Sequence, residues 1–198
     1  MRARQETVDQ TRQRITEATV ALHERVGPRH TTVSAIADEA GVTRLTVYRH
    51  FPDESSLVVA CSEHWGKLHP RPDVSSWQGI ADPRTRLRTA LLETYRWART
   101  AAPMMTKIHR DLDVMPEFVA EFLADDARAR VAALAEPFGV AGVARRRLAY
   151  ALTHALDIRT WESLCVRGRL TDLEAVDAMV AFVMAVLELP AGRRRAVR

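Results

Sequence analysis

The sequence has few cysteines and no long apolar run. Its two cysteines, Cys61 and Cys165, lie far apart and lack the spacing of a metal-binding motif. We expect free thiols, either as ordinary core residues, which we favour, or as a redox sensor. No apolar segment approaches the ~20 residues that span a bilayer, and residues 1–10 are polar where a secretion signal needs an apolar core. These absences predict a cytoplasmic protein with no membrane partner, no bound metal and no cofactor.

Lysine is also scarce, although basic residues are not. Lys67 and Lys107 are the only lysines among 29 basic residues, and the net charge is +4. We attribute the arginine excess first to codon bias and only second to phosphate binding. A mild positive charge permits nucleic-acid binding without demonstrating it. With 198 residues, 47% of them hydrophobic and 27% charged, the composition is that of a soluble globular protein.

No group of residues has the pattern of a catalytic site. The serines lack a base partner, and there is no glycine-rich phosphate loop. His154 and Asp157 lie one helical turn apart but without a nucleophile. We therefore expect that the protein is not an enzyme.

What the sequence does contain is a strong pattern over residues 32–51. An apolar helical face is formed by Val33, Ile36, Ala37 and Ala40. Gly41 follows as the residue that most readily takes positive φ beyond a helix end. Thr43 can then cap a second helix, in which Val47 and Phe51 continue the buried stripe. The pattern predicts two short helices joined by a tight turn.

The second of these helices presents polar and aromatic residues outward. These residues are Arg44, Leu45, Thr46, Tyr48, Arg49 and His50. A short helix held by a crossing partner fits the major groove of B-DNA in width and depth. The pattern therefore predicts a helix-turn-helix.

Residues 31–57, TTVSAIADEAGVTRLTVYRHFPDESSL, resemble the DNA-binding segment of tetracycline-repressor-like (TetR family) regulators. The shared features are the TT pair, the IA..AGV segment and the short helix that ends in Y-x-x-F-P. The preceding helix matches loosely, and the rest of the chain is similar only in length and helical content. Two positions differ, because the family often has Gly where this chain has Leu45 and often Lys where it has Glu54. Leu45 places an apolar group beside the bases, and Glu54 removes a common phosphate contact.

The resemblance and the helix pattern together predict a DNA-binding set. Its members are Thr32, Thr43, Arg44, Leu45, Thr46, Tyr48, Arg49 and His50. We expect Arg44 and Thr46 at base edges and Leu45 in apolar contact with a base. Phosphate contacts are expected from Thr32, Tyr48, Arg49 and His50. For Tyr48, a core aromatic with an exposed hydroxyl is the alternative. The arginines near the N-terminus either contact DNA or form a solvated surface, and the sequence favours neither; they are Arg2, Arg4, Arg12 and Arg14.

Apolar periodicity interrupted by proline and glycine predicts an all-α protein of about nine helices. A first helix is expected over residues 7–26, capped at Thr7, and a fourth over 53–68. Further helices are expected over residues 84–101, 103–114, 116–136, 143–166 and 171–189. Residues 69–83 have the composition of a linker in which Trp77 anchors packing. We therefore predict a three-helix helix-turn-helix DNA-binding domain over residues 1–69 and a helical effector-binding and dimerisation domain over residues 70–198.

The last predicted helix is apolar on nearly all sides. A helix near the end of a small domain is not covered on every side by its own chain, so a second copy is expected to cover it. The alternative is a central helix of a monomer. A homodimer places two recognition helices about 34 Å apart, or a multiple of it, and predicts a pseudo-palindromic operator in double-stranded DNA. The arginines of residues 193–198 are expected at a solvated end.

Aromatic, thioether and histidine side chains are spread over several helices of the second domain. The candidate ligand-binding set is Trp97, Met105, His109, Phe118, Phe122, His154 and Trp161. Such residues line an apolar pocket or fill a core, and for any single one the core is favoured. The resemblance implies a small-molecule effector that releases a repressor from its operator. The alternatives are an effector-independent regulator or activator, and a helical small-molecule-binding protein.

Overall fold

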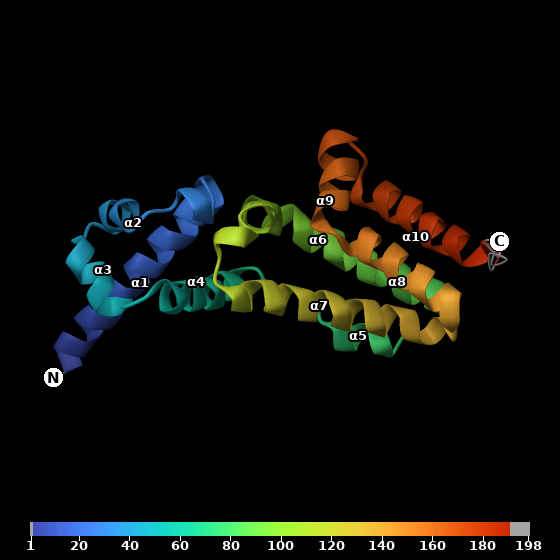
Figure 1. The fold of residues 1–198 in the computed structure, drawn as a ribbon, viewed down its shortest axis with the longest axis horizontal. Helices are drawn as coiled ribbons and strands as arrows, with labels where there is room; N and C mark the ends of the chain where they lie inside the picture. The colour runs from blue at the N-terminus through green and yellow to red at the C-terminus, as the bar shows by residue number, and fades with distance from the viewer. Residues whose placement is uncertain (1, 191–198) are drawn as a thin grey trace, which may run out of the picture. The chain divides into compact units, whose positions relative to one another are not determined.

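The computed structural model describes residues 2–190, and the side chains from residue 6 onward. The described chain is all-α, with ten α-helices (Figure 1). None of the described helices combines the length and apolar character needed to span a membrane. Arg2 and Arg4 lie outside the described side chains, and the arginines of residues 193–198 lie outside the described residues. The predictions made for them therefore stay predictions.

The chain forms two compact units, each built from two segments of the sequence. One unit comprises Met1–Arg71 and Thr100–Phe122, and the other comprises Pro72–Arg99 and Leu123–Arg198. Helices α6 and α7 each contribute to both units. The first unit is thus discontinuous, and the functional division expected at residue 70 stays a prediction.

The first unit contains the predicted helix-turn-helix. Its helices are α1 (Arg2–Arg25), α2 (Val33–Ala40), α3 (Arg44–His50) and α4 (Glu54–Leu68). The last part of α6 (Pro83–Arg110), the 3-10 turns Pro28–His30 and Leu112–Val114, and the start of α7 (Glu117–Ala135) complete it. Helix α1 packs against α2 and α4, and α2 packs against α3. The buried residues between them are Ile15, Ala18, Leu22, Ile36, Ala37, Ala40, Val47, Phe51 and Leu57.

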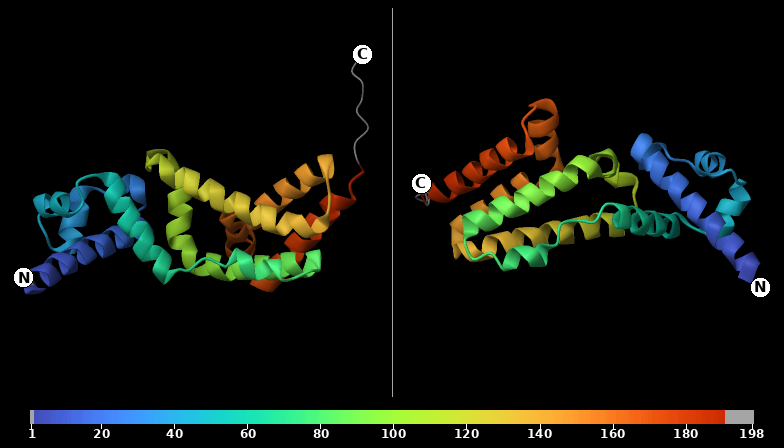
Figure 2. Two further views of the ribbon diagram at one scale, coloured as in Figure 1. Left: turned by 90° about the horizontal axis from the view of Figure 1, so that it is seen from below. Right: turned by 180° about the vertical axis from the view of Figure 1, so that it is seen from behind.

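In the second unit, α8 and α10 pack along each other (Figure 2). Its further elements are α5 (Val74–Gln78), α8 (Gly142–Leu156), α9 (Ile158–Trp161), a π-helix (Glu162–Arg167) and α10 (Asp172–Glu188). Its fully buried residues include Trp77, Leu87, Leu91, Tyr95, Leu134, Leu148, Leu152, Val176 and Val183. Helix α10 begins with a capping box, because the Thr171 and Glu174 side chains each accept from the other residue's backbone N–H.

The predicted start of the first helix is wrong. Helix α1 begins at Arg2, and Thr7 lies inside it, where its carbonyl accepts a hydrogen bond from the Thr11 hydroxyl at 2.9 Å. Residues 2–6 are good helix formers and include no glycine or proline. Nothing in them stops the helix before the threonine that was expected to cap it.

The predicted break at Pro103 is also wrong. Helix α6 continues through Pro103 to Arg110, although an interior proline costs about 3 kcal/mol. The proline is exposed, whereas Ala101, Met104 and Met105 on either side of it are buried. Burial on both sides of the proline keeps the helix continuous.

Two further predictions in the second unit need correction. The helix expected over residues 143–166 is interrupted at Asp157, whose backbone is extended and whose side chain accepts from the Arg159 N–H at 2.8 Å. The expected linker contains α5, which Asp73 caps. Trp77 is fully buried there and donates its indole N–H to Glu93 at 2.7 Å. The prediction that it anchors packing is confirmed.

Candidate nucleic-acid interface

The turn between α2 and α3 is fixed by backbone geometry and by local caps. Thr32 caps α2 by accepting from the Ala35 N–H at 3.2 Å. At the other end, Gly41 takes the left-handed conformation with φ 63 and ψ 41. The Val42 N–H then donates to the Ala37 carbonyl at 2.9 Å. The chain therefore reverses sharply before α3 begins.

Helix α3 is held at its start by a cap and along one face by the core. Thr43 Oγ1 accepts from the Thr46 N–H at 3.2 Å, and the two hydroxyl oxygens lie 2.9 Å apart. Val47 is 1% exposed, and Phe51, which ends the helix, is 2% exposed. The hydroxyls of Thr43 and Thr46 are thus partly committed to holding the helix.

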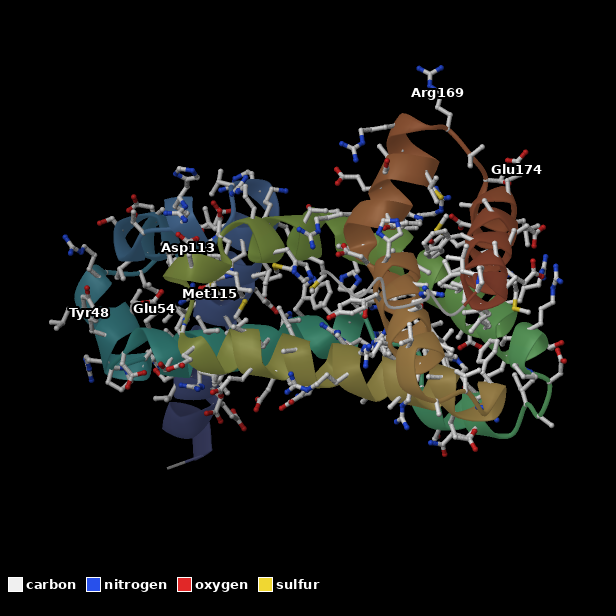
Figure 3. The ribbon with its side chains drawn as sticks, turned by 45° about the vertical axis from the view of Figure 1, so that its right-hand side comes forward. Tyr48, Glu54, Asp113, Met115, Arg169 and Glu174 are labelled. Carbon is white, nitrogen blue, oxygen red and sulfur yellow. The ribbon has the colours of Figure 1, made fainter. Side chains whose placement is uncertain are left out.

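The remaining predicted residues face outward from α3. Leu45 is 70% exposed and Tyr48 is 47% exposed, while Arg44 and Arg49 are also exposed. Figure 3 shows Tyr48 projecting outward from α3, with Glu54 at the first turn of α4. Tyr48 is therefore not a core aromatic. Thr46 and His50 are half-buried, and Thr32 is exposed at the start of α2.

Arg12 of α1 fixes the other end of α3, a role that the sequence analysis missed. Its Nη1 donates to the His50 carbonyl at 2.7 Å, and its guanidinium carbon lies 4.1 Å from the centre of the Phe51 ring. A cation at a helix C-terminus also interacts favourably with the helix dipole. No local pattern announces a contact between residues 38 positions apart. Arg12 is therefore neither a purely solvated residue nor free to reach DNA.

His23 and Cys61 lie together in the interior of the first unit. His23 Nδ1 is 3.7 Å from Cys61 Sγ. Burial lowers the pKa of His23 to about 4, against the opposing effect of Asp111, and burial raises the pKa of the Cys61 thiol to about 12. Burial likewise raises the pKa of Cys165 to about 11. Both cysteines are protonated at neutral pH, which favours ordinary thiols over redox sensors.

A buried carboxylate connects the last part of α6 to the corner between α1 and α2. Asp111 is fully buried and accepts from Arg110 Nε at 2.7 Å and from the Arg29 backbone N–H at 3.2 Å. The Arg110 side chain also donates to the Val26 carbonyl at 3.0 Å. The Arg110 hydrogen bond lowers the pKa of Asp111 to about 2. Asp113, labelled in Figure 3, forms an ion pair with Arg29 at the same corner.

Gly27 allows this close approach. Its φ is 90, and a Cβ there would lie 2.3 Å from Arg110 Nη2 and 2.5 Å from Asp111 Oδ2. A side chain at this position is excluded by backbone conformation and by space together.

The seven candidate ligand-binding residues divide between the two units. Met105, His109, Phe118 and Phe122 belong to the first, and Trp97, His154 and Trp161 belong to the second. Met105 and Trp161 are buried, Trp97 is half-buried, and His109, Phe118, Phe122 and His154 are exposed. The His154 ring meets the Phe182 ring edge-on, with centroids 5.7 Å apart. Within residues 2–190, no cluster of three or more His, Cys, Asp or Glu side chains is arranged to hold a metal ion.

Comparison with known proteins points to the same segment. Residues 15–61 match the family model described as bacterial regulatory proteins, tetR family. The HTH-type transcriptional regulator TtgR of Pseudomonas putida is 31% identical over 96 residues, which are 48% of this chain and 46% of that protein. The match therefore spans less than half the length of this relative.

Two solved structures have similar folds over most of the chain. AibR, in complex with isovaleryl coenzyme A and operator DNA, has a TM-score of 0.63 and 24% identity, covering 86% of this chain and 96% of that one. NalD, the secondary repressor of the MexAB-OprM multidrug efflux pump in Pseudomonas aeruginosa, has a TM-score of 0.63 and 19% identity, covering 91% and 97%. At these identities the likeness concerns the fold alone. The sequence match contains α2, α3 and the outward residues of α3, so residues 15–61 of this chain are similar to the bacterial regulatory proteins of the tetR family.

Proposed function

We propose that the protein is a sequence-specific DNA-binding transcriptional regulator of the cytoplasm, most simply a repressor. The observation that supports this most strongly is α3 itself. It is capped by Thr43, anchored by Val47 and clamped by Arg12, while Arg44, Leu45 and Tyr48 face outward. Such a rigid short helix with exposed polar and apolar tips is suited to the major groove.

Each outward residue has a distinct proposed role. Arg44 and Thr46 contact base edges, and Leu45 meets a thymine methyl group. Tyr48, Arg49, His50 and Thr32 contact phosphates. Thr43 acts mainly by positioning, because its hydroxyl oxygen already accepts from the Thr46 N–H.

A homodimer supplies the second reading helix. Helix α10 has an exposed apolar surface that includes Phe182, which is 38% exposed, and Ala178, Ala181 and Ala185. Tyr150 of α8 is 77% exposed. Two copies of this surface bury each other's apolar side chains and favour a pseudo-palindromic operator. His154, whose ring touches Phe182, then belongs to the dimer surface rather than to a ligand pocket.

A small-molecule effector bound by the domain of residues 70–198 releases the operator. Helix α6 contributes to both units, and its last part holds the α1–α2 corner through Asp111 and Arg110. An effector that binds one position of α6 more tightly than another therefore shifts the free energy of DNA binding. The shift equals the difference between the effector's binding free energies for the two positions. AibR, whose structure contains isovaleryl coenzyme A and operator DNA, supports this proposal by analogy, as does the repressor NalD.

The test is selection of binding sites from random duplex DNA at several salt concentrations. We expect an inverted repeat, with affinity that falls steeply as salt rises. Arg44→Ala should relax specificity at one base pair per half-site, whereas Arg49→Ala should weaken all sequences alike. Arg128→Ala, which removes an exposed arginine of α7, is the matched control and should change neither. Equal loss of specificity from Arg44→Ala and Arg49→Ala would show that these roles are misassigned.

A further inference from the structure

The interior of the second unit contains an arginine whose hydrogen-bonding capacity is only partly used. Arg130 of α7 is 5% exposed. Among the residues that the structure describes, its Nε and Nη2 have no hydrogen-bond partner. Asp126 Oδ2 lies 3.0 Å from Nε and forms an ion pair, but it is not aligned with the N–H bond. Asp126 thus balances the charge of Arg130, but the N–H groups of Nε and Nη2 donate no hydrogen bond.

A second buried arginine of the same unit, Arg86, has hydrogen-bond partners for its guanidinium nitrogens. Arg86 donates from Nε to the Ile80 carbonyl at 2.7 Å and from Nη2 to the Gln78 carbonyl at 3.1 Å. Its Nη1 donates to the Ala133 carbonyl and to Glu136 at 3.1 and 3.0 Å. Buried polar groups are normally paired in this way, so the open donors of Arg130 call for an explanation.

The two open donors are those that together grip a carboxylate. In a guanidinium the Nε–H and one Nη2–H bond point in nearly the same direction, and their spacing matches the two oxygens of a carboxylate. Arg binds planar anions in this bidentate manner with both energy and geometric selectivity. The open pair is therefore a ready-made carboxylate site.

The surroundings add a hydroxyl and an apolar wall. The Trp97 ring centroid lies 6.0 Å from the Arg130 guanidinium carbon. Thr94, three residues earlier on α6, is 3% exposed, and its hydroxyl also has no hydrogen-bond partner among the described residues. Leu91 and Ala98 on the same helix are buried. Thr94 lies one turn before Trp97 on α6 and so on the same face of that helix, and the Trp97 ring faces Arg130; on this basis the unpaired Thr94 hydroxyl is the additional donor assigned to the site.

We propose that Arg130, with Thr94 and Trp97, binds the carboxylate of the small-molecule effector, which is a monocarboxylic acid with an apolar aliphatic or aromatic body. This rests on the proposed effector control of DNA binding and names the chemical class of the effector. Arg130 holds the carboxylate through Nε and Nη2, the Thr94 hydroxyl donates to one oxygen, and the indole packs on the apolar body. Asp126 is the internal competitor for Nε. None of these residues except Trp97 belongs to the ligand-binding set predicted from the sequence.

The experiment measures binding of matched acids and amides to the full chain by calorimetry. The probes are hexanoate and phenylacetate, with hexanamide and phenylacetamide as uncharged counterparts. We expect the acids to bind more tightly than the amides by roughly 10-fold or more, because charge-assisted hydrogen bonds are lost with the amides. Arg130→Met and Thr94→Val should weaken the acids and leave the amides little changed. Asp126→Asn should strengthen the acids.

Two control variants distinguish a loss of acid binding from a loss of folding. Arg128→Met removes an exposed arginine of the same helix and should leave every affinity unchanged. Arg130→Lys keeps the charge without the paired donors and should bind the acids more weakly than wild type, with circular dichroism showing an intact fold. Equal binding of acids and amides, no binding of either acid at millimolar concentration, or unchanged acid affinity in Arg130→Met would each overturn the proposal.

The proposed function has a separate readout. If the acids bind through Arg130 but never release selected operator DNA, effector control by this site fails while the carboxylate site stands. If uncharged compounds release the operator and the acids do not bind, the regulator stands and the carboxylate site fails.

Discussion

The two compact units treat their buried polar groups differently. In the first unit, the buried Thr16, Thr19, His23 and Asp111 each contact a polar partner. In the second, each guanidinium nitrogen of Arg86 donates a hydrogen bond, whereas Arg130 and Thr94 keep buried polar atoms unpaired within the described residues. Unpaired buried donors cost free energy unless a ligand or water completes them.

This difference matches what each unit is proposed to do. A DNA-reading helix must keep one geometry, and a fully paired interior supports that. A ligand-binding unit must instead keep some hydrogen-bonding groups unpaired until the ligand binds. These groups lower the stability of the free protein, and ligand binding offsets that loss. Three sets of substitutions test the comparison, from the largest expected effect to the smallest.

The first compares the two buried arginines of the second unit. Arg86→Met should lower the free energy of unfolding by about 3–5 kcal/mol, because three backbone carbonyls lose their donor. Arg130→Met should lower it by less, because it removes the ion pair with the partly exposed Asp126 but no hydrogen bond from Nε or Nη2. Urea unfolding of the purified variants measures both. An equal decrease in the free energy of unfolding for both variants would show that Arg130 has a structural role and that its unpaired donors are not kept for a ligand.

The second uses pH to probe the interior of the first unit. His23 protonates with a pKa of 6.5 when unfolded but about 4 when folded, so protons bind preferentially to the unfolded state between these values. Stability is then constant above pH 6.5 and falls as pH drops toward 4, by about 3 kcal/mol in total. His23→Gln should remove most of this slope, and His30→Gln, at an exposed site, should keep it. A slope that survives in His23→Gln would assign the acid sensitivity to other groups.

The third tests the clamp on the recognition helix. Arg12→Leu should cost about 1 kcal/mol of stability, since it removes the bond to the His50 carbonyl and the cation above the Phe51 ring. It should also weaken binding to a selected operator, because the end of α3 is less firmly held. Arg14→Leu, two residues along the same helix, is the control for a general loss of positive charge. If both variants bind DNA equally weakly, Arg12 acts through its charge alone.

The sequence predicted features whose causes are local. The cap at Thr43 joins residues three positions apart, and the turn at Gly41 depends on one residue's backbone freedom. The outward face of α3 follows from helical periodicity, as does the burial of Val47. Such features are set within one or two turns of chain.

The features that the sequence did not reveal depend on distant partners. Arg12 meets the His50 carbonyl across 38 positions, and Asp111 meets Arg29 across 82. Helix α6 runs through Pro103 because packing on both sides outweighs a local penalty. Arg130 could not be singled out among 29 basic residues, because its burial and its open donors exist only in the folded unit.

The measurement that tests the central claim most directly is dimethyl sulfate footprinting, which reports on guanine N7 in the major groove, of the full chain on a duplex obtained by selection. The account predicts protection in two adjacent major grooves centred about 34 Å apart, or a multiple of it, and loss of protection at the central bases of both in Arg44→Ala. Uniform weak protection along the duplex, or a single protected groove with a monomer bound, would contradict it.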